Sequence, residues 1–292
     1  MIKIKSLIVP VTLIVVLILA VAVFFYQFPA DPAGEQPRKE KIGIGIIASD
    51  EKIIAQYQAL TDYLNQYSDD NWYLVPLRDY GSYLSQLESK QIKAAFAGST
   101  AGYRMIKENI AVPVARGEVD GVSTYHSYVF TRRDSGLNSI AHLKDKRFAY
   151  VDVNTSAGYI YPVYLIKSKG YDPENFFRVA SFLGTHENAI NAVLEEKFDG
   201  GAAKDSAWKK MASQNPDLDK ELQIIATSGD FPEQTFMIST DFGSEEKNEL
   251  RELLLGMSDS EEGRLYLEKM GLDRFIATTS KDFGEVKNII NF

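Results

Sequence analysis

From residue 41 onward, short apolar runs alternate with stretches whose apolar residues recur at helical spacing. Runs of the first kind predict buried strands, whereas Tyr57, Leu60 and Leu64 illustrate the second kind. The first set predicts strands at 42–47, 72–77, 94–97 and 110–115 and helices at 52–67, 80–89 and 99–107. Strands that alternate with helices of this length predict a mostly parallel sheet covered on both faces.

A second alternating set begins at residue 147, after a short helical turn at 139–143. It continues with predicted helices at 187–197 and 205–213 and predicted strands at 200–203 and 222–227. Two extended passages, 125–132 and 235–240, join the sets, and only helices are expected after them, at 244–257, 261–270 and 283–290. The pattern therefore predicts two α/β lobes joined by two hinge strands, with lobe 1 at 41–128 plus 235–292 and lobe 2 at 129–234. A ligand would bind between the lobes, beyond the carboxyl ends of the strands.

The N-terminal segment has a different pattern, because residues 7–28 carry no charge. This run exceeds the ~18 apolar residues that predict a membrane span. Phe28-Pro29-Ala30 matches a signal-peptide cleavage site poorly, so we expect residues 1–28 to be an uncleaved anchor. Lys3 and Lys5 favour a cytoplasmic tail, which leaves the rest of the chain outside. Residues 29–40 are rich in proline and charge, as is typical of a tether.

Composition excludes several classes of function. The 292 residues are 45% hydrophobic, include no cysteine and carry a formal net charge of −8. Disulfides, thiolate catalysis and lipid attachment through an N-terminal cysteine are therefore excluded. No run of Lys and Arg offers a nucleic-acid surface. A single small anion remains possible, because the groups that line a cleft set its local field.

Two junctions between a strand and a helix are candidates for binding such an anion. In the first, an apolar run ends at Asn154-Thr155-Ser156 before a helical segment, and in the second, Gly98-Ser99-Thr100 follows the strand 94–97. The first N–H groups of a helix have no partner within the helix and carry partial positive charge, so an anion fits there. Hydroxyls at these positions could donate to the anion, or they could simply cap the helix. Two such junctions facing each other across a cleft would supply donors to one tetrahedral anion.

Three further residues are candidates, each with a plainer alternative. His186 falls at a turn between a strand and a helix and could donate to an anion, or it could be a surface or cap residue. Asp205 opens a helix, where it could merely complement the helix dipole. Asp230 could be a turn residue.

The sequence does not support catalysis. Ser156, His186 and Asp205 could be imagined as a triad, but nothing in their spacing favours this arrangement over binding. The three histidines lack metal-site spacing, and neither a nucleophile elbow nor a Walker loop is present. We therefore expect no catalytic residues, no metal and no cofactor.

Several motifs in order resemble those of the phosphonate/phosphite-type substrate-binding proteins of ABC transporters. The similarity covers nearly everything from Lys41 to Met257, and its motifs are Gly98 to Tyr103, Asp134 to Leu137, Leu143 to Ala149, Asn154 to Tyr159, Gly184 to Ala189, Asp199 to Ala203 and Ala226 to Gly229. This chain departs from the family in keeping a membrane span and in showing Asn154-Thr155-Ser156 where the family has Ser-x-Ser.

The resemblance implies a two-lobed type II periplasmic-binding-protein fold. It implies that the oxyanion is held by the Asn154-Thr155-Ser156 loop, chiefly through Thr155 and Ser156, with help from Ser99, Thr100 and His186. Asp205 and Asp230 are the nearest candidates for holding an amine, as acidic residues do in members that bind aminoalkylphosphonates.

The function expected from the sequence is an extracytoplasmic, membrane-anchored solute-binding component of an ABC transporter. It would be a monomer that binds a phosphonate, phosphite or phosphate unchanged and delivers it to a permease. One alternative is a ligand-sensing domain for a membrane partner, and another is an enzyme on the same scaffold.

Overall fold

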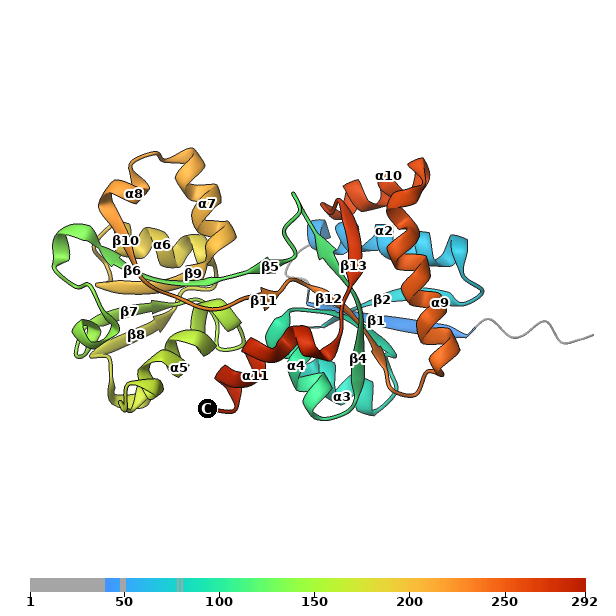
Figure 1. Cartoon of the computed structure of the whole chain (residues 1–292), viewed down its shortest axis with the longest axis horizontal. Helices are drawn as coiled ribbons and strands as arrows, with labels where there is room; N and C mark the ends of the chain where they lie inside the picture. The colour runs from blue at the N-terminus through green and yellow to red at the C-terminus, as the bar shows by residue number, and fades with distance from the viewer. Residues whose placement is uncertain (1–39, 48–50, 78, 80) are drawn as a thin grey trace, which may run out of the picture. The chain divides into compact units, whose positions relative to one another are not determined.

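The computed structural model describes residues 40–47, 51–77, 79 and 81–292. The predicted anchor, residues 1–28, and residues 29–39 of the predicted tether lie outside the described residues. Within the described ranges, no helix combines the length and apolar character needed to cross a bilayer. Residues 41–292 form one compact unit, in which two sheets with their helices make the two lobes drawn in Figure 1.

Lobe 1 is built on a six-stranded sheet with the strand order β13-β4-β12-β3-β1-β2. Its strands are β1 (Lys41–Ile47), β2 (Asn71–Leu77), β3 (Ala94–Ala97), β4 (Ala111–Glu118), β12 (Thr235–Ser239) and β13 (Arg274–Ala277). Its helices are α2 (Glu51–Tyr67), α3 (Gly81–Glu88), α4 (Ser99–Lys107), α9 (Ser244–Leu255), η5 (Gly256–Asp259), α10 (Glu261–Met270), η6 (Ser280–Phe283) and α11 (Gly284–Ile290).

Lobe 2 is built on a five-stranded sheet with the order β10-β6-β9-β7-β8. Its strands are β6 (Ser127–Arg132), β7 (Arg147–Tyr150), β8 (Val179–Phe182), β9 (Gly200–Lys204) and β10 (Leu222–Thr227). Its helices are η1 (Arg133–Ser135), η2 (Ile140–Leu143), η3 (Ser156–Ile160), α5 (Tyr161–Ser168), η4 (Pro173–Asn175), α6 (His186–Leu194), α7 (Asp205–Gln214) and α8 (Leu218–Glu221).

The two sheets repeat one strand order. In lobe 1, β1 lies between β2 and β3 and runs parallel to both, while β12 runs antiparallel between β3 and β4. In lobe 2, β7 lies between β8 and β9 and runs parallel to both, while β6 runs antiparallel between β9 and β10. In each sheet, the strand that follows a crossing between the lobes, β12 or β6, thus runs antiparallel to its neighbours, and β13 is a second antiparallel strand at the edge of lobe 1.

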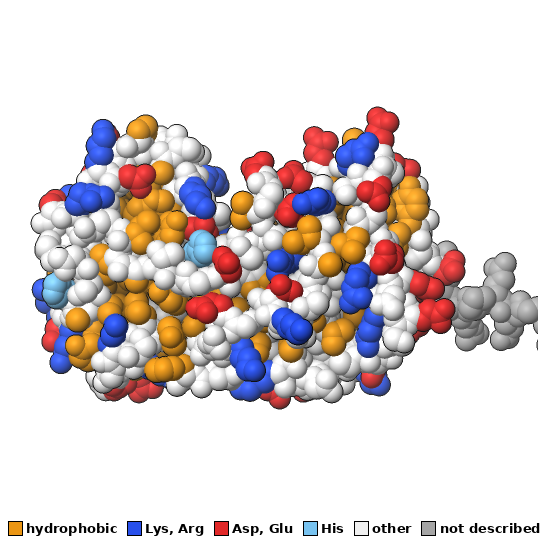
Figure 2. Space-filling model, in the orientation of Figure 1, with side chains coloured by type: hydrophobic (Ala, Val, Ile, Leu, Met, Phe, Trp, Pro, Cys, Tyr) orange, Lys and Arg blue, Asp and Glu red, His pale blue; other side chains and the backbone are white. Residues whose placement is uncertain are grey.

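The chain crosses between the lobes through a short two-stranded ribbon. In this ribbon, β5 (Thr124–Tyr125) pairs antiparallel with β11 (Phe231–Pro232), as Figure 1 shows between the two sheets. Most of each predicted hinge passage belongs instead to a sheet, because residues 127–132 form β6 in lobe 2 and residues 235–239 form β12 in lobe 1. On the face drawn in Figure 2, the surface is notched between the lobes and acidic and basic side chains are interspersed.

The expectation that only helices follow residue 240 is wrong, because β13 adds a strand to the edge of lobe 1. It pairs antiparallel with β4, and its phenylalanine, Phe275, is buried against Phe96. Four residues are too few to carry a periodic signal, so this strand forms because a sheet edge and a hydrophobic core already lie beside it.

Candidate functional site

In lobe 1, the candidate site begins where β3 ends and α4 starts. Gly98 is the N-cap residue of α4, and its carbonyl accepts the first helical bond, from the N–H of Gly102 at 2.9 Å. The amides of Ser99, Thr100 and Ala101 precede that first bond, and glycine offers no side chain to cap them. The side chains of Ser99 and Thr100 are almost fully buried. This end of the helix therefore presents amides and two buried hydroxyls together.

In lobe 2, the chain turns sharply between β7 and η3, a single π-helical turn. Asp152 shapes the turn, because its carboxylate accepts the N–H of Asn154 at 2.8 Å and its carbonyl accepts the Thr155 hydroxyl at 2.8 Å. The carbonyl of Thr155 accepts from the amides of Tyr159 and Ile160, so the amides of residues 156–158 precede the first bonds of the turn. Since the hydroxyl of Thr155 is turned back to Asp152, it does not cap these amides.

Hydroxyls from the two lobes meet at the same place. Ser156 Oγ lies 2.7 Å from Ser99 Oγ and within hydrogen-bonding distance of Thr100 Oγ1, and Tyr125 OH lies 2.6 Å from Ser99 Oγ. Two helical N-termini that carry uncapped amides thus converge from opposite sides of the interface between the lobes. The helix N-termini carry partial positive charge, and the hydroxyl groups can turn their hydrogens toward a ligand. Together they favour binding of an oxyanion at this point.

A cavity of about 150 Å³ lies at this meeting point. Six of the predicted site residues line it, namely Ser99, Thr100, Asn154, Thr155, Ser156 and His186. Four side chains that the sequence did not suggest line it as well: Tyr125, Lys204, Glu233 and Gln234.

His186, the first residue of α6, faces the cavity as a neutral donor. Thr185 caps this helix by accepting the N–H of Asn188 at 3.1 Å, so the histidine is not the cap. Its Nδ1 accepts the backbone N–H of Lys204 at 3.1 Å, which places the proton of the neutral ring on Nε2. Burial, reinforced by the nearby Lys204 ammonium, lowers the pKa of His186 to about 4. The ring therefore offers an uncharged N–H at neutral pH.

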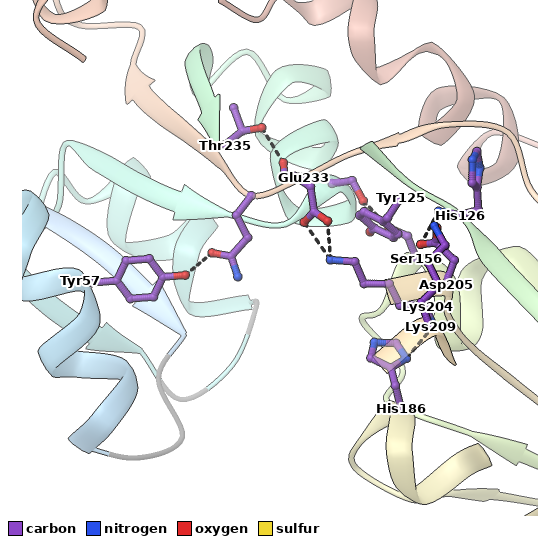
Figure 3. A network of polar contacts seen from close by, with 12 residues as sticks. Tyr57, Tyr125, His126, Ser156, His186, Lys204, Asp205, Lys209, Glu233 and Thr235 are labelled. Atoms are coloured by element: carbon purple, nitrogen blue, oxygen red, sulfur yellow. Dashed lines mark hydrogen bonds and ion pairs between the residues drawn. The ribbon is translucent and has the colours of Figure 1, made fainter. Parts of the chain in front are cut away.

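The side chains of Lys204 and Glu233 form an ion pair between the end of β9 and the segment that follows the ribbon, drawn in Figure 3. Lys204 Nζ lies 2.7 Å and 2.8 Å from the two carboxylate oxygens of Glu233 and 4.4 Å from the centre of the Tyr125 ring. Lys204 ends β9 in lobe 2, whereas Glu233 lies between β11 and β12. Because the pair is neutral, Glu233 can lie near an anion without a large repulsive cost.

The two predicted aspartates lie outside this cavity. The buried carboxylate of Asp205, at the start of α7, accepts the N–H of His126 at 3.0 Å and pairs with Lys209 Nζ at 2.7 Å. Asp230 is exposed beside the ribbon, 3.5 Å from His126 Nε2. Asp205 therefore joins the start of α7 to the segment between β5 and β6, and Asp230 lies in the segment between β10 and β11.

Ser156, His186 and Asp205 do not assemble into a triad. The hydroxyl of Ser156 bonds to Ser99 and Thr100, Nδ1 of His186 accepts from the backbone of Lys204, and Asp205 binds His126 and Lys209. Each member has partners other than the two that a charge-relay arrangement requires.

Three of the four missed residues belong to the ribbon and its flanks, whereas Lys204 lies at the junction of β9 and α7. Tyr125 is in β5, and Glu233 and Gln234 follow β11, where no local pattern marks a binding residue. For these three residues, the available signal in the sequence was that the chain passes from one lobe to the other there, since segments that pass between two lobes must line the space between them.

The chain is similar to known proteins along most of its length. A family model described as "ABC transporter, phosphonate, periplasmic substrate-binding protein" matches residues 42–283. The chain is 20% identical over 273 residues to a probable ABC transporter phosphite-binding protein, PhnD1, of Prochlorococcus marinus, covering 89% of this chain and 91% of that one. It is 21% identical over 271 residues to the phosphonates-binding periplasmic protein of Escherichia coli, covering 89% and 79%.

A solved structure of PhnD1 from Prochlorococcus marinus in complex with methylphosphonate has the same fold. Its TM-score is 0.68 at 19% identity, over 86% of this chain and 97% of that one. The fold is thus the α/β periplasmic-binding-protein fold. With the family model matching most of its length, the chain belongs to the phosphonate-type periplasmic substrate-binding proteins of ABC transporters, a family of binding proteins rather than enzymes.

Proposed function

We propose that this protein captures a phosphonate, phosphite or phosphate-like oxyanion in the cavity between its lobes and delivers it unchanged to an ABC permease. The observation that carries the proposal is the contact of Ser156 with both Ser99 and Thr100 across the lobes. An oxyanion in the cavity would replace these bonds and accept from the same hydroxyls and from the amides behind them. A ligand bound in this way holds the lobes together.

The chemistry of the cavity suits a tetrahedral oxyanion. Its donors are hydroxyls, helix amides and the Nε2–H of His186, while its one ammonium group is paired with Glu233. Uncharged O–H and N–H groups that are buried bind a charged oxygen strongly, because each such hydrogen bond is charge-assisted. The names of the two relatives, which refer to phosphite and to phosphonates, support the same class of ligand.

The wider organisation is also part of the proposal. Residues 1–28 anchor the chain in the membrane, residues 29–40 tether it, and the binding unit acts as a monomer outside the cytoplasm. The repeated strand order of the two sheets supports the type II form of the fold. The proposed division puts 41–128 plus 235–292 in lobe 1 and 129–234 in lobe 2, although residues 127–128 already belong to β6 in the sheet of lobe 2, and the β5–β11 ribbon lies between the two sheets.

Adjacent hydroxyls of one loop provide the test. We expect Ser156→Ala to weaken binding of methylphosphonate or phosphite roughly 10- to 150-fold, because a hydrogen bond to a charged group contributes about 1.5–3 kcal/mol. Thr155→Ala is the matched control, since that hydroxyl donates to Asp152 and its loss should lower stability more than affinity. Calorimetric titration of the full chain, with thermal unfolding measured in parallel, separates the two effects. Wild-type affinity in Ser156→Ala contradicts the proposal.

A further inference from the structure

A second, larger cavity adjoins the proposed anion site. It has a volume of about 420 Å³ and lies between α2, the β4–β5 turn and the α10–β13 loop of lobe 1 and the start of α7 in lobe 2. The two cavities share Tyr125, Glu233 and Gln234 as lining residues. A ligand whose anionic group lies between Ser99 and Ser156 can therefore extend past these three side chains into the larger space.

The three shared side chains are held in place by their own contacts. Tyr125 OH lies 2.6 Å from Ser99 Oγ, and Gln234 accepts a hydrogen bond from Tyr57. Glu233 pairs with Lys204, as Figure 3 shows. Side chains fixed in this way border the passage between the two cavities. They favour a ligand that extends from one cavity into the other in a single orientation.

The wall of the larger cavity is mostly apolar. Tyr57, Phe96, Val119, Val122 and Leu272 line it. The two valines are exposed and lie on either side of a tight turn in which their backbones exchange hydrogen bonds of 3.0 Å and 2.9 Å. Apolar surface of this kind gains free energy when an apolar group covers it.

The acidic groups of the lining do not single out an amine. Asp205 is paired with Lys209, and Glu233 with Lys204. Asp120 is exposed at the tip of the valine turn. An ammonium group entering the cavity would have to compete with a lysine already held at 2.7 Å for either buried or half-buried carboxylate.

The volumes of the two cavities also suit different parts of one ligand. About 150 Å³ suits a small tetrahedral anion, whereas 420 Å³ falls in the range of about 300–1,000 Å³ that is typical of sites for larger organic ligands. We propose that this protein's preferred ligand is an organophosphonate with an extended apolar or aromatic substituent, which occupies the larger cavity. The inference rests on the proposed function, because it assigns the second half of the same ligand.

The test compares ligands that share one anionic group. Titration calorimetry of the full chain with phosphite, methylphosphonate, 2-aminoethylphosphonate and phenylphosphonate should rank phenylphosphonate first, about tenfold or more tighter than methylphosphonate. Equal affinity for phenylphosphonate and methylphosphonate overturns the inference and leaves the proposed function standing, as does a preference for the aminoethyl ligand. Failure of all four to bind contradicts the proposed function itself.

A cavity-filling variant locates the substituent. Val122→Trp should reduce the ratio of phenylphosphonate to methylphosphonate affinity to near one, because the indole would occupy the cavity. Val179→Trp is the matched control, since Val179 is similarly exposed but lies on β8 at the edge of lobe 2, and the ratio should stay as in the wild type. An unchanged ratio in Val122→Trp overturns the placement. Should that variant fail to fold, the ranking of ligands by the wild-type protein still decides the inference.

Discussion

At the scale of single residues, His186 couples the binding site to the stability of lobe 2. Its pKa in the folded chain, about 4, lies below the ordinary value of about 6.5. As the pH falls from 6.5 to 4, the unfolded chain therefore takes up a proton that the folded chain does not. The stability present above pH 6.5 is lost across this window, on the order of 3 kcal/mol at about 1.4 kcal/mol per pKa unit.

His186→Asn tests this linkage. The Asn oxygen can take the place of Nδ1 and accept from Lys204, but the amide does not titrate. Between pH 7 and pH 4, we expect the wild type to lose about 3 kcal/mol more unfolding free energy than the variant, measured by denaturant titration without ligand. Equal losses in both proteins would show that His186 is not the titrating group.

The residues that sequence could predict are those whose chemistry follows from local geometry. Ser99 and Ser156 stand at strand–helix junctions, and the orphan amides there are a consequence of helix formation itself. Asp205 shares that local position, yet its carboxylate accepts from the backbone of His126, a contact that only the tertiary structure decides, as well as pairing with Lys209 on the same helix. Glu233 and Lys204 are 29 residues apart and meet because the segment between β11 and β12 passes the end of β9.

At the scale of elements, η3 depends on a close approach of Gly158 to Val151, the residue after β7. A Cβ placed on Gly158 would lie 2.6 Å from Val151 Cγ2 and 2.8 Å from Thr155 Oγ1. Gly158→Ala should therefore lower the unfolding free energy by about 1–3 kcal/mol through overpacking. It should also weaken anion binding, because the displaced turn carries Ser156.

Gly284→Ala provides the comparison for this prediction, because a Cβ there meets nothing within 4 Å and the residue lies in α11. It should leave stability unchanged or raise it by up to about 1 kcal/mol, since alanine favours helix over glycine. Chemical denaturation and ligand titration of both variants check the pair. Equal stability of the two would mean that the close approach of Gly158 to Val151 is unimportant.

Elements with a clear period could be predicted from sequence, and those created by contact could not. The helix at 52–67 is found as α2, because its apolar residues recur on one face. By contrast, β13 and the two-residue strands β5 and β11 exist only through pairing with distant partners. The predicted hinge passages, 125–132 and 235–240, lie mostly in β6 and β12, because these segments are long enough to join the sheets.

At the scale of the whole molecule, contacts besides the ribbon join the lobes near the site. Asn291 Nδ2 donates to Tyr103 OH in α4 at 2.6 Å, while the Phe292 ring lies 5.1 Å from that of Tyr164 in α5. The chain beyond α11 thus contacts the same two helical segments whose N-terminal ends face the cavity, since η3 leads directly into α5. Ligand bonds across the site would add to these contacts between the lobes.

The central claim is that hydroxyls from both lobes share one oxyanion. A crystal structure of the full chain with methylphosphonate tests it most directly. The account predicts phosphonate oxygens within hydrogen-bonding distance of Ser99, Thr100 and Ser156, with the direct bond between Ser99 and Ser156 replaced by bonds to the ligand. A phosphonate bound to one lobe alone, or bound elsewhere while Ser99 still contacts Ser156, would contradict it.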